Sequence, residues 1–236
     1  MTLSKRAAII ASAIILPSLL MAHGDVTPQA MDTSALPDIG EEWLAENPYR
    51  DPAGDYWQTA IDIGSSGYNS NCARCHGLGV VSGGLAPDLR YLEASDYGDE
   101  WYLERFQHGM TQNGITKMPA FGEVLGQQAA WAIKTYIETR PDDGALDDHQ
   151  DRLKEIRNAM QQHADAITSG ADPVEFADEV EALKAELTEI ANSIETGSGA
   201  PVADSIASRS VAAFDGTPES FKHVVDILTI GLSATE

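Results

Sequence analysis

The stretch Cys72-Ala73-Arg74-Cys75-His76 contains the only two cysteines of the 236-residue chain. The second cysteine follows the first by three positions, and a histidine comes next, which is the spacing of a c-type haem attachment site. Two thiols about one helical turn apart can each add to a haem vinyl group, and the imidazole can then ligate the iron. We therefore predict one covalently bound haem c, held by Cys72 and Cys75 and ligated by His76.

A redox-active disulfide and a zinc site are the two alternatives for this pair of cysteines. A redox-active pair usually lies in a strand–helix unit, and no β-α-β pattern surrounds Cys72 and Cys75. A structural zinc ion needs four protein ligands, and the chain has no second Cys-x-x-Cys pair to complete such a site. Haem is the preferred interpretation, and both alternatives stay open at this point.

The chain is strongly acidic, with a formal net charge of −22 at pH 7. Residues 41–140 contain 14 acidic and 7 basic residues, whereas residues 141–236 contain 20 acidic and 6 basic ones. Such a surface repels phosphates, so nucleic acid is not expected as a partner. A protein with a basic surface is the partner that the charge favours.

The first 22 residues are predicted to be a secretory signal peptide. Lys5 and Arg6 form a basic start, and an apolar run follows over residues 7–20. The run is short for a membrane-spanning helix and contains Pro17. Cleavage after Ala22 would leave an exported protein without stable membrane insertion. Haem is attached to this motif outside the cytoplasm. The signal peptide and the motif therefore both predict that the protein is located in the periplasm.

The mature chain is predicted to be all-α and divided into three regions. Residues 23–56 contain several prolines and aromatic residues, which indicates an arm that packs over a core. Residues 57–140 form the domain around the cysteines, with one helix from about residue 57 to 71 and another from about 126 to 139. Residues 141–236 form an acidic helical extension.

The spacing Gly64-x3-Tyr68-x3-Cys72-x2-Cys75-His76 resembles the first helix of class I cytochromes c. In that family the glycine lets the first and last helices cross closely, and aromatic residues join the contact. The resemblance implies a cytochrome c fold for the central domain. It also implies one-electron transfer without bond chemistry by side chains, so the chain is not expected to be an enzyme.

The resemblance implies two further site residues. Pro87 would offer its carbonyl oxygen to Nδ1 of the ligand His76, which fixes the ring and raises its basicity. Met118, on a non-helical loop and followed directly by a proline, would be the sixth iron ligand, and its soft thioether favours ferrous iron. Met110 and His108 are the alternatives for this position.

A narrower resemblance is to the small periplasmic cytochromes c that accept electrons from PQQ-dependent alcohol dehydrogenases, including those acting on methanol. The similar segments are His23–Ala30, Asn71–Leu78, Gly83–Leu92, Asn113–Gly114 and Met118–Phe121. The resemblance implies such a dehydrogenase as electron donor, with another cytochrome c or a terminal oxidase as acceptor. The alternatives are a general shuttle between a quinol-oxidising complex and a terminal oxidase, or a haem-based sensor, which would need an open sixth position.

The extension begins after the helix-breaking stretch 141–144. Apolar stripes over residues 146–167 and 176–194 predict two helices, the second with an a/d seam, that pack as an antiparallel hairpin. Asp172 is a candidate N-cap at the turn between them. No haem motif occurs here, and the acidic residues predict either a solvated face or a docking or oligomerisation module.

A glycine-rich stretch divides the extension. Residues 197–201 are predicted to be a linker. Two further helices follow over about residues 202–213 and 218–232, with Thr217 as the cap of the second. The last helix has an apolar face wide enough to need burial.

Overall fold

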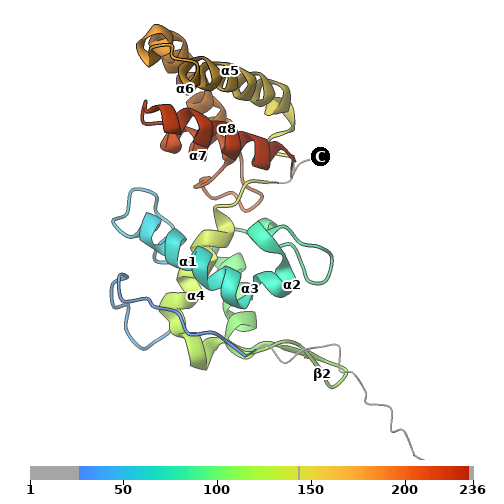
Figure 1. The fold of residues 1–236 in the computed structure, drawn as a ribbon. Coiled ribbons are helices and arrows are strands. Elements are labelled where there is room, and N and C mark those ends of the chain that lie inside the picture. Colours follow the sequence, from blue (N-terminus) through green and yellow to red (C-terminus); the bar gives the residue numbers. More distant parts are fainter. Residues whose placement is uncertain (1–26, 143, 234–236) are drawn as a thin grey trace, which may run out of the picture.

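The computed structural model describes residues 27–142 and 144–233 (Figure 1). The fold is mostly helical, as predicted, and it consists of an N-terminal part and the extension, each around its own hydrophobic core. The predicted signal peptide, residues 1–22, lies outside the described residues. Within the described ranges, no helix has the length and apolar character to cross a membrane.

From residue 27 onward, the described N-terminal part contains four helices, two short 3-10 turns and one small hairpin. The helices are α1 (Trp57–Asn71), α2 (Ala73–His76), α3 (Asp96–His108) and α4 (Gly122–Glu138). The 3-10 turns are η1 (Leu78–Val80) and η2 (Leu89–Tyr91), and the hairpin strands are β1 (Met110–Gln112) and β2 (Ile115–Met118). Gly126, with φ 75°, divides α4 into a first turn and a main helix, so the predicted helix from about residue 126 is confirmed.

Helices α1 and α4 cross at the centre of the N-terminal part. A Cβ atom added to Gly64 would lie 2.0 Å from the carbonyl oxygen of Ala132, so only glycine permits this approach. One turn later the rings of Tyr68 and Tyr136 pack with their centroids 5.5 Å apart. The helix crossing expected from the class I resemblance is therefore confirmed.

We expect Gly64→Ala to lower the free energy of unfolding by roughly 3 kcal/mol, the upper part of the usual overpacking range. The added methyl group meets backbone atoms of α4, which cannot move aside as a flexible side chain could. Gly83→Ala is the matched control, because its Cβ would meet nothing within 4 Å. Urea unfolding of the two variants measures the difference, and equal midpoints would contradict the prediction.

The arm over residues 27–56 is tied to α1 and α4. The backbone N–H of Gln29 donates to Oδ1 of Asn71 (2.6 Å), and Nδ2 of Asn71 donates back to the Gln29 carbonyl (3.2 Å). Farther along, the N–H of Leu44 donates to Oε1 of Gln127 on α4 (3.1 Å). The arm is thus held beside the residue that precedes Cys72.

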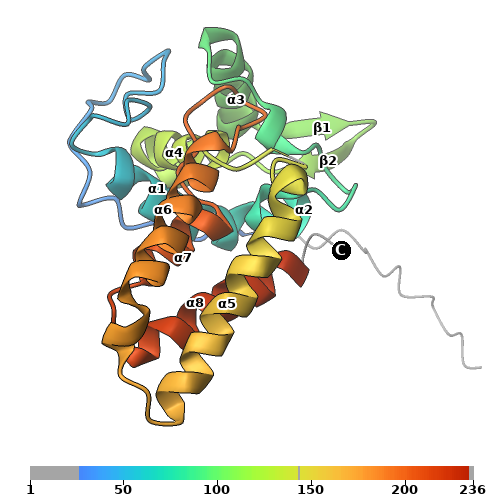
Figure 2. The same ribbon diagram turned by 90° about the horizontal axis from the view of Figure 1, so that it is seen from above.

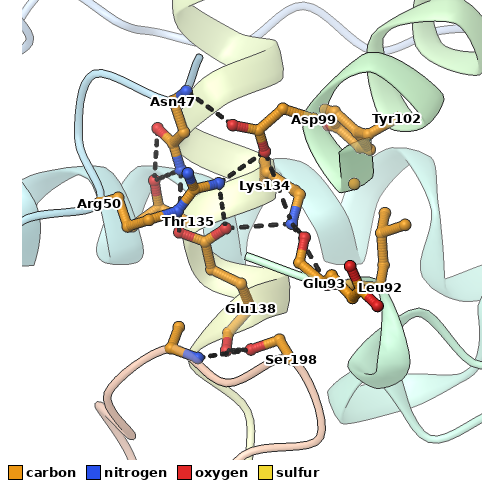
Figure 3. A network of polar contacts seen from close by, with 12 residues as sticks. Asn47, Arg50, Leu92, Glu93, Asp99, Tyr102, Lys134, Thr135, Glu138 and Ser198 are labelled. Carbon is orange, nitrogen blue, oxygen red and sulfur yellow. Dashed lines mark hydrogen bonds and ion pairs between the residues drawn. The ribbon is translucent and has the colours of Figure 1, made fainter. Parts of the chain in front are cut away.

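A buried ionic cluster joins the arm to α3 and α4 (Figure 3). It consists of Arg50, Asp99, Lys134 and Glu138, and the side chains of Asp99, Lys134 and Glu138 are almost fully buried. Glu138 Oε2 lies 3.0 Å from Lys134 Nζ and 3.1 Å from Arg50 Nη2. Asp99 Oδ1 lies 2.6 Å from the same Arg50 nitrogen. Two acids and two bases balance, so burial leaves no net charge.

Over residues 144–233, the extension contains four helices and two 3-10 turns. They are η3 (Asp147–His149), α5 (Gln150–Thr168), η4 (Pro173–Phe176), α6 (Ala177–Ser193), α7 (Ile206–Ala213) and α8 (Pro218–Ser233). Both predicted caps are present. The Asp172 side chain accepts from the N–H of Val174 (3.0 Å), and Thr217 Oγ1 accepts from the N–H of Ser220 (3.3 Å).

Helices α5 and α6 are antiparallel neighbours, as predicted, since Arg152 of α5 pairs with Glu186 of α6 and His149, just before α5, lies 3.0 Å from Ser193 Oγ. Their backbones, however, do not pack closely along their length. Instead α8 packs along α5, and α7 packs against both α6 and α8 (Figure 2). The reason is the wide apolar face of α8, whose Val224 and Leu228 are fully buried in the same core as Leu153 and Ile156 of α5. Burying α8 separates the two helices that the short turn connects.

The stretch predicted as a linker, residues 197–201, packs against the N-terminal part. The N–H of Ala94 donates to the carbonyl of Ser198 (2.9 Å). Ser198 Oγ donates to the carbonyl of Glu138 at the end of α4 (2.5 Å). Gly197 lies against Tyr91, so this glycine permits close packing between the two parts rather than a free connection.

Candidate functional site

Cys72, Cys75 and His76 lie on one tight turn between α1 and α2. The N–H groups of Cys75 and His76 both donate to the Cys72 carbonyl, at 3.1 and 3.0 Å. Both cysteines are free thiols and are partly exposed. Burial raises the pKa of Cys72 to about 12, and the charge of Cys75 adds to this shift. Thiolates used for redox exchange have lowered pKa values, so this environment disfavours a redox-active disulfide.

The imidazole of His76 is oriented by Pro87, as the resemblance implied. Nδ1 lies 2.9 Å from the Pro87 carbonyl oxygen. Because a carbonyl only accepts, Nδ1 carries the proton and Nε2 remains free to bind a metal. Burial lowers the pKa of His76, although the bond to Pro87 and the charge of Asp88 act in the opposite direction. The lowered pKa keeps the ring in the neutral state that ligation needs.

The loop that carries Pro87 is fixed from both sides. Ser82 Oγ donates to the carbonyl of Ala86 (2.5 Å). After the proline, Asp88 Oδ2 accepts from Nη2 of Arg90 (2.7 Å), and Arg90 is almost completely buried. The position of the Pro87 carbonyl is therefore determined by structure that surrounds it and not by the proline alone.

Met118 lies at the end of β2, partly buried against the same core as Cys72. Its partner across the ladder is Met110, which is 40% exposed. Gly109 has φ 66°, and a Cβ there would lie 2.4 Å from the Met118 carbonyl, so α3 can end beside Met118 only at a glycine. His108 is exposed. Of the three candidates for sixth ligand, Met118 is the one that packs into the core.

The β-hairpin itself was not predicted. Asn113 and Gly114 both have positive φ, at 53° and 74°, and form the two-residue turn between the strands. The Asn-Gly pair is the strongest short-range signal for such a hairpin, so the sequence contained the information. The hairpin places Met118 on hydrogen-bonded backbone rather than on an irregular loop.

One functional contact could not be seen in the sequence pattern. Tyr68 was expected only as a packing residue, but its hydroxyl also donates to the carbonyl of Gly77 (2.8 Å). Gly77 directly follows His76, and a Cβ at Gly77 would lie 1.8 Å from the Val81 carbonyl. Helical spacing shows the face on which an aromatic ring lies, but it does not show what the hydroxyl reaches.

The donor set fits haem c. The turn offers two thiols and one imidazole with a free Nε2, and the hairpin, which lies on the same side of the N-terminal part as α2, offers a thioether (Figures 1 and 2). Apolar side chains are exposed next to both segments, namely Leu78, Leu85 and Ile115. Among the residues that the structure describes, no group of three or more His, Cys, Asp or Glu side chains is placed to hold a metal ion.

Comparisons with known proteins agree with this geometry. A family profile described as cytochrome c oxidase, cbb3-type, subunit III, matches residues 59–137. Cytochrome c550 of Pseudomonas aeruginosa is 48% identical over 134 residues, which is 57% of this chain and 92% of that protein. No solved structure matches the chain.

Two enzymes of Pseudomonas putida match over a shorter stretch. The quinohemoprotein alcohol dehydrogenase ADH IIB is 35% identical over 82 residues, and ADH-IIG is 31% identical over 84 residues. These matches cover 34% and 36% of this chain and 11% of each enzyme. The likeness is therefore to one small segment of each dehydrogenase.

The crossing of α1 and α4 at Gly64, together with the Cys-x-x-Cys-His turn, is the arrangement of a class I c-type cytochrome. With the c550 relative matched over almost its whole length, the chain belongs to the class I c-type cytochromes, the family that includes cytochrome c550. Its cofactor is covalently bound haem c, and its role is electron transport.

Proposed function

We propose that this protein is a periplasmic electron carrier with His76 and Met118 as the axial iron ligands and Cys72 and Cys75 as the covalent attachment points. The observation that carries the proposal is the hydrogen bond of 2.9 Å between His76 Nδ1 and the Pro87 carbonyl, which leaves Nε2 free for iron. Haem c supplies reversible one-electron chemistry when bound.

The side chains hold the redox centre and do not react with a substrate. His76 would bind iron through Nε2, while its bond to the Pro87 carbonyl keeps the proton on Nδ1 and makes the imidazole a stronger donor. The Met118 thioether would supply the second axial ligand and favour ferrous iron. A closed sixth position supports an electron carrier rather than an enzyme or a haem-based sensor, since both of the latter need access to iron.

We propose that the electron donor is a PQQ-dependent alcohol dehydrogenase, a class that includes enzymes acting on methanol. Two observations support this donor. The chain resembles the small cytochromes that serve such enzymes, and it is similar to a segment of two quinohemoprotein alcohol dehydrogenases. The acceptor would be another cytochrome c or a terminal oxidase.

The charge of the molecule supports a transient electrostatic encounter. Electron-transfer complexes are small and weak, so attraction between opposite charges raises the encounter rate without requiring tight binding. With a net charge of −22, this protein would approach a basic surface on the dehydrogenase. The expected second-order rate of reduction is therefore high at low salt and falls as salt screens the charges.

Stopped-flow reduction of the full-length protein by a purified PQQ-dependent dehydrogenase tests this donor. Between 0.01 and 0.15 M ionic strength the Debye length shrinks from about 30 to about 8 Å, and we expect the rate to fall by roughly tenfold or more. Rates that do not depend on salt would contradict electrostatic docking. No reduction at any salt concentration would exclude the dehydrogenase as donor.

A second function is supported by one specific observation. The family profile that matches residues 59–137 is that of a cbb3-type oxidase subunit. The chain could therefore carry electrons from a quinol-oxidising complex to a terminal oxidase. Reduction by a quinol-oxidising complex, and oxidation by an oxidase, in the absence of any dehydrogenase would favour this alternative.

A further inference from the structure

Residues 194–205 of the extension, which we call the clasp, contact the N-terminal part. The clasp lies over the end of α4 (Figure 3) and over the stretch that follows η2. At the end of α4 the N–H of Ala203 donates to the carbonyl of Thr139 (3.2 Å), next to the Ser198–Glu138 bond already described. Ser198, Ala200 and Ser205 of the clasp are buried. The contact is thus a packed interface and not a loose tether.

A first path of contacts leads from the clasp to the ring of His76. Gly197 lies so close to η2 that an added Cβ would be 2.7 Å from the ring of Tyr91 and 3.1 Å from the carbonyl oxygen of Arg90. Arg90 holds both carboxylate oxygens of Asp88, with Nε donating to Oδ1 (3.0 Å) and Nη2 donating to Oδ2 (2.7 Å). Asp88 directly follows Pro87, whose carbonyl accepts from the His76 ring.

A second path leads from the clasp to the backbone beside His76. Asp204 Oδ2 accepts from Nη1 of Arg140 (2.8 Å), and the Arg140 guanidinium lies 4.5 Å from the centroid of the Tyr136 ring. Tyr136 packs on Tyr68, which donates to the carbonyl of Gly77. Every step is a direct contact between neighbouring groups. The path ends on the carbonyl group of Gly77, the residue after the predicted ligand.

The second path has a feature that a simple tether would not require. Arg140 is almost fully buried, yet its Nε and Nη2 atoms have no hydrogen-bond partner. Burying an arginine is costly unless its charge is compensated, and Asp204 of the clasp is the carboxylate paired with it. The stability of this corner of the N-terminal part therefore depends on the clasp being in place.

We propose that the clasp holds His76 in position through these two paths and thereby sets the reduction potential of the haem. The proposal rests on His76 being the axial ligand, as proposed above. A strong bond from Nδ1 to the Pro87 carbonyl makes the imidazole more basic and favours ferric iron. Releasing the clasp would loosen Pro87 and Gly77, weaken that bond, and raise the potential.

The Asp204→Asn variant tests the second path in the full-length holoprotein. The amide keeps the shape of the side chain but no longer compensates the charge of Arg140. At a fixed solution potential we expect about a threefold higher ratio of ferrous to ferric protein, which is roughly a 30 mV rise for one electron. Asp178→Asn is the matched control, because Asp178 is exposed in the first turn of α6, far along the chain from the clasp. The control removes the same charge without touching either path.

A Gly197→Val variant tests the first path, since the larger side chain must displace Tyr91 or the clasp itself. We expect a rise in potential in the same direction. Tyr68→Phe removes only the hydroxyl that reaches Gly77, and combining it with Asp204→Asn should shift the potential by less than the sum of the two single shifts, because both act on one path. If Gly197→Val does not fold, the Asp204→Asn comparison alone decides.

Proton NMR of the ferric protein separates this proposal from the proposed ligation. Strongly shifted ring resonances of His76 in the unaltered protein establish it as the ligand, and their absence would refute the ligation itself. With ligation established, we expect faster solvent exchange of the Nδ1 proton in Asp204→Asn than in Asp178→Asn. Equal exchange rates and equal potentials in these two variants would refute the role of the clasp while leaving the ligation intact.

Discussion

A Met118→Ala variant is expected to lose the low-spin spectrum of the ferric protein and to have a much lower reduction potential. Alanine offers no donor, so water or hydroxide takes the sixth position, and the preference of the thioether for ferrous iron is lost. Axial ligands set haem potentials over a range of about 0.8 V, so a fall of a substantial fraction of that range is expected. Redox titration and the visible spectrum measure both effects.

The same variant should bind cyanide or carbon monoxide rapidly at neutral pH, because the open position then resembles that of a sensor. Met110→Ala is the matched control, since Met110 faces Met118 across the hairpin but is exposed. The control should retain the spectrum and potential of the unaltered protein. An unchanged spectrum in Met118→Ala, or a large change in Met110→Ala, would overturn the assignment of the sixth ligand.

The parts of the structure that could be predicted are those governed by local spacing. Gly64 and Tyr68 lie on one helix face at four-residue intervals before Cys72, and such a pattern identifies the helix and its buried face, whereas its partner helix came from the family resemblance. The capping roles of Asp172 and Thr217 also follow from neighbouring residues, because a cap bonds to an N–H two or three positions later. In these cases the interacting groups are close in sequence.

The parts that could not be predicted depend on contacts between distant segments. The apolar stripe of α6 fits a coiled-coil seam, but a stripe does not specify which helix fills it, and the wide face of α8 competed with α6 for α5. The packing of Ser198 on Glu138 spans 60 residues. The group to which the Tyr68 hydroxyl donates is determined by the path of the loop after His76. Periodicity gives the buried face of each element but not the partner.

The ionic cluster is another such case, and replacing Glu138 with glutamine should have the largest effect on stability of any change considered. The cluster then contains Arg50 and Lys134 against Asp99 alone, so one buried positive charge is left without compensation. Breaking a buried ion pair in this way costs about 3–5 kcal/mol. Against a total stability of roughly 5–15 kcal/mol, such a loss is a large fraction of what keeps the N-terminal part folded.

Glu186→Gln provides the matched control, because Glu186 pairs with Arg152 near the surface of the extension. Exposed pairs contribute about 0–1 kcal/mol, so the control should unfold at nearly the urea concentration of the unaltered protein. Adding Lys134→Met to Glu138→Gln should recover part of the loss, since it removes the charge that lost its partner. A loss below about 1 kcal/mol in Glu138→Gln would show that the cluster does not stabilise the fold.

The loss of stability in Glu138→Gln should also depend on pH, and the ionisation of Lys134 sets the direction of this dependence. Burial lowers the pKa of Lys134 from its ordinary value of 10.5, and Glu138 and Asp99 oppose this shift. Without Glu138 the native pKa falls further, whereas the unfolded chain still binds the proton up to about pH 10.5. Because the unfolded state then holds more protons, stability relative to the unaltered protein rises with pH. The deficit measured at pH 9 should therefore be smaller than at pH 7, and a deficit that does not change would mean that Lys134 keeps its charge in the variant.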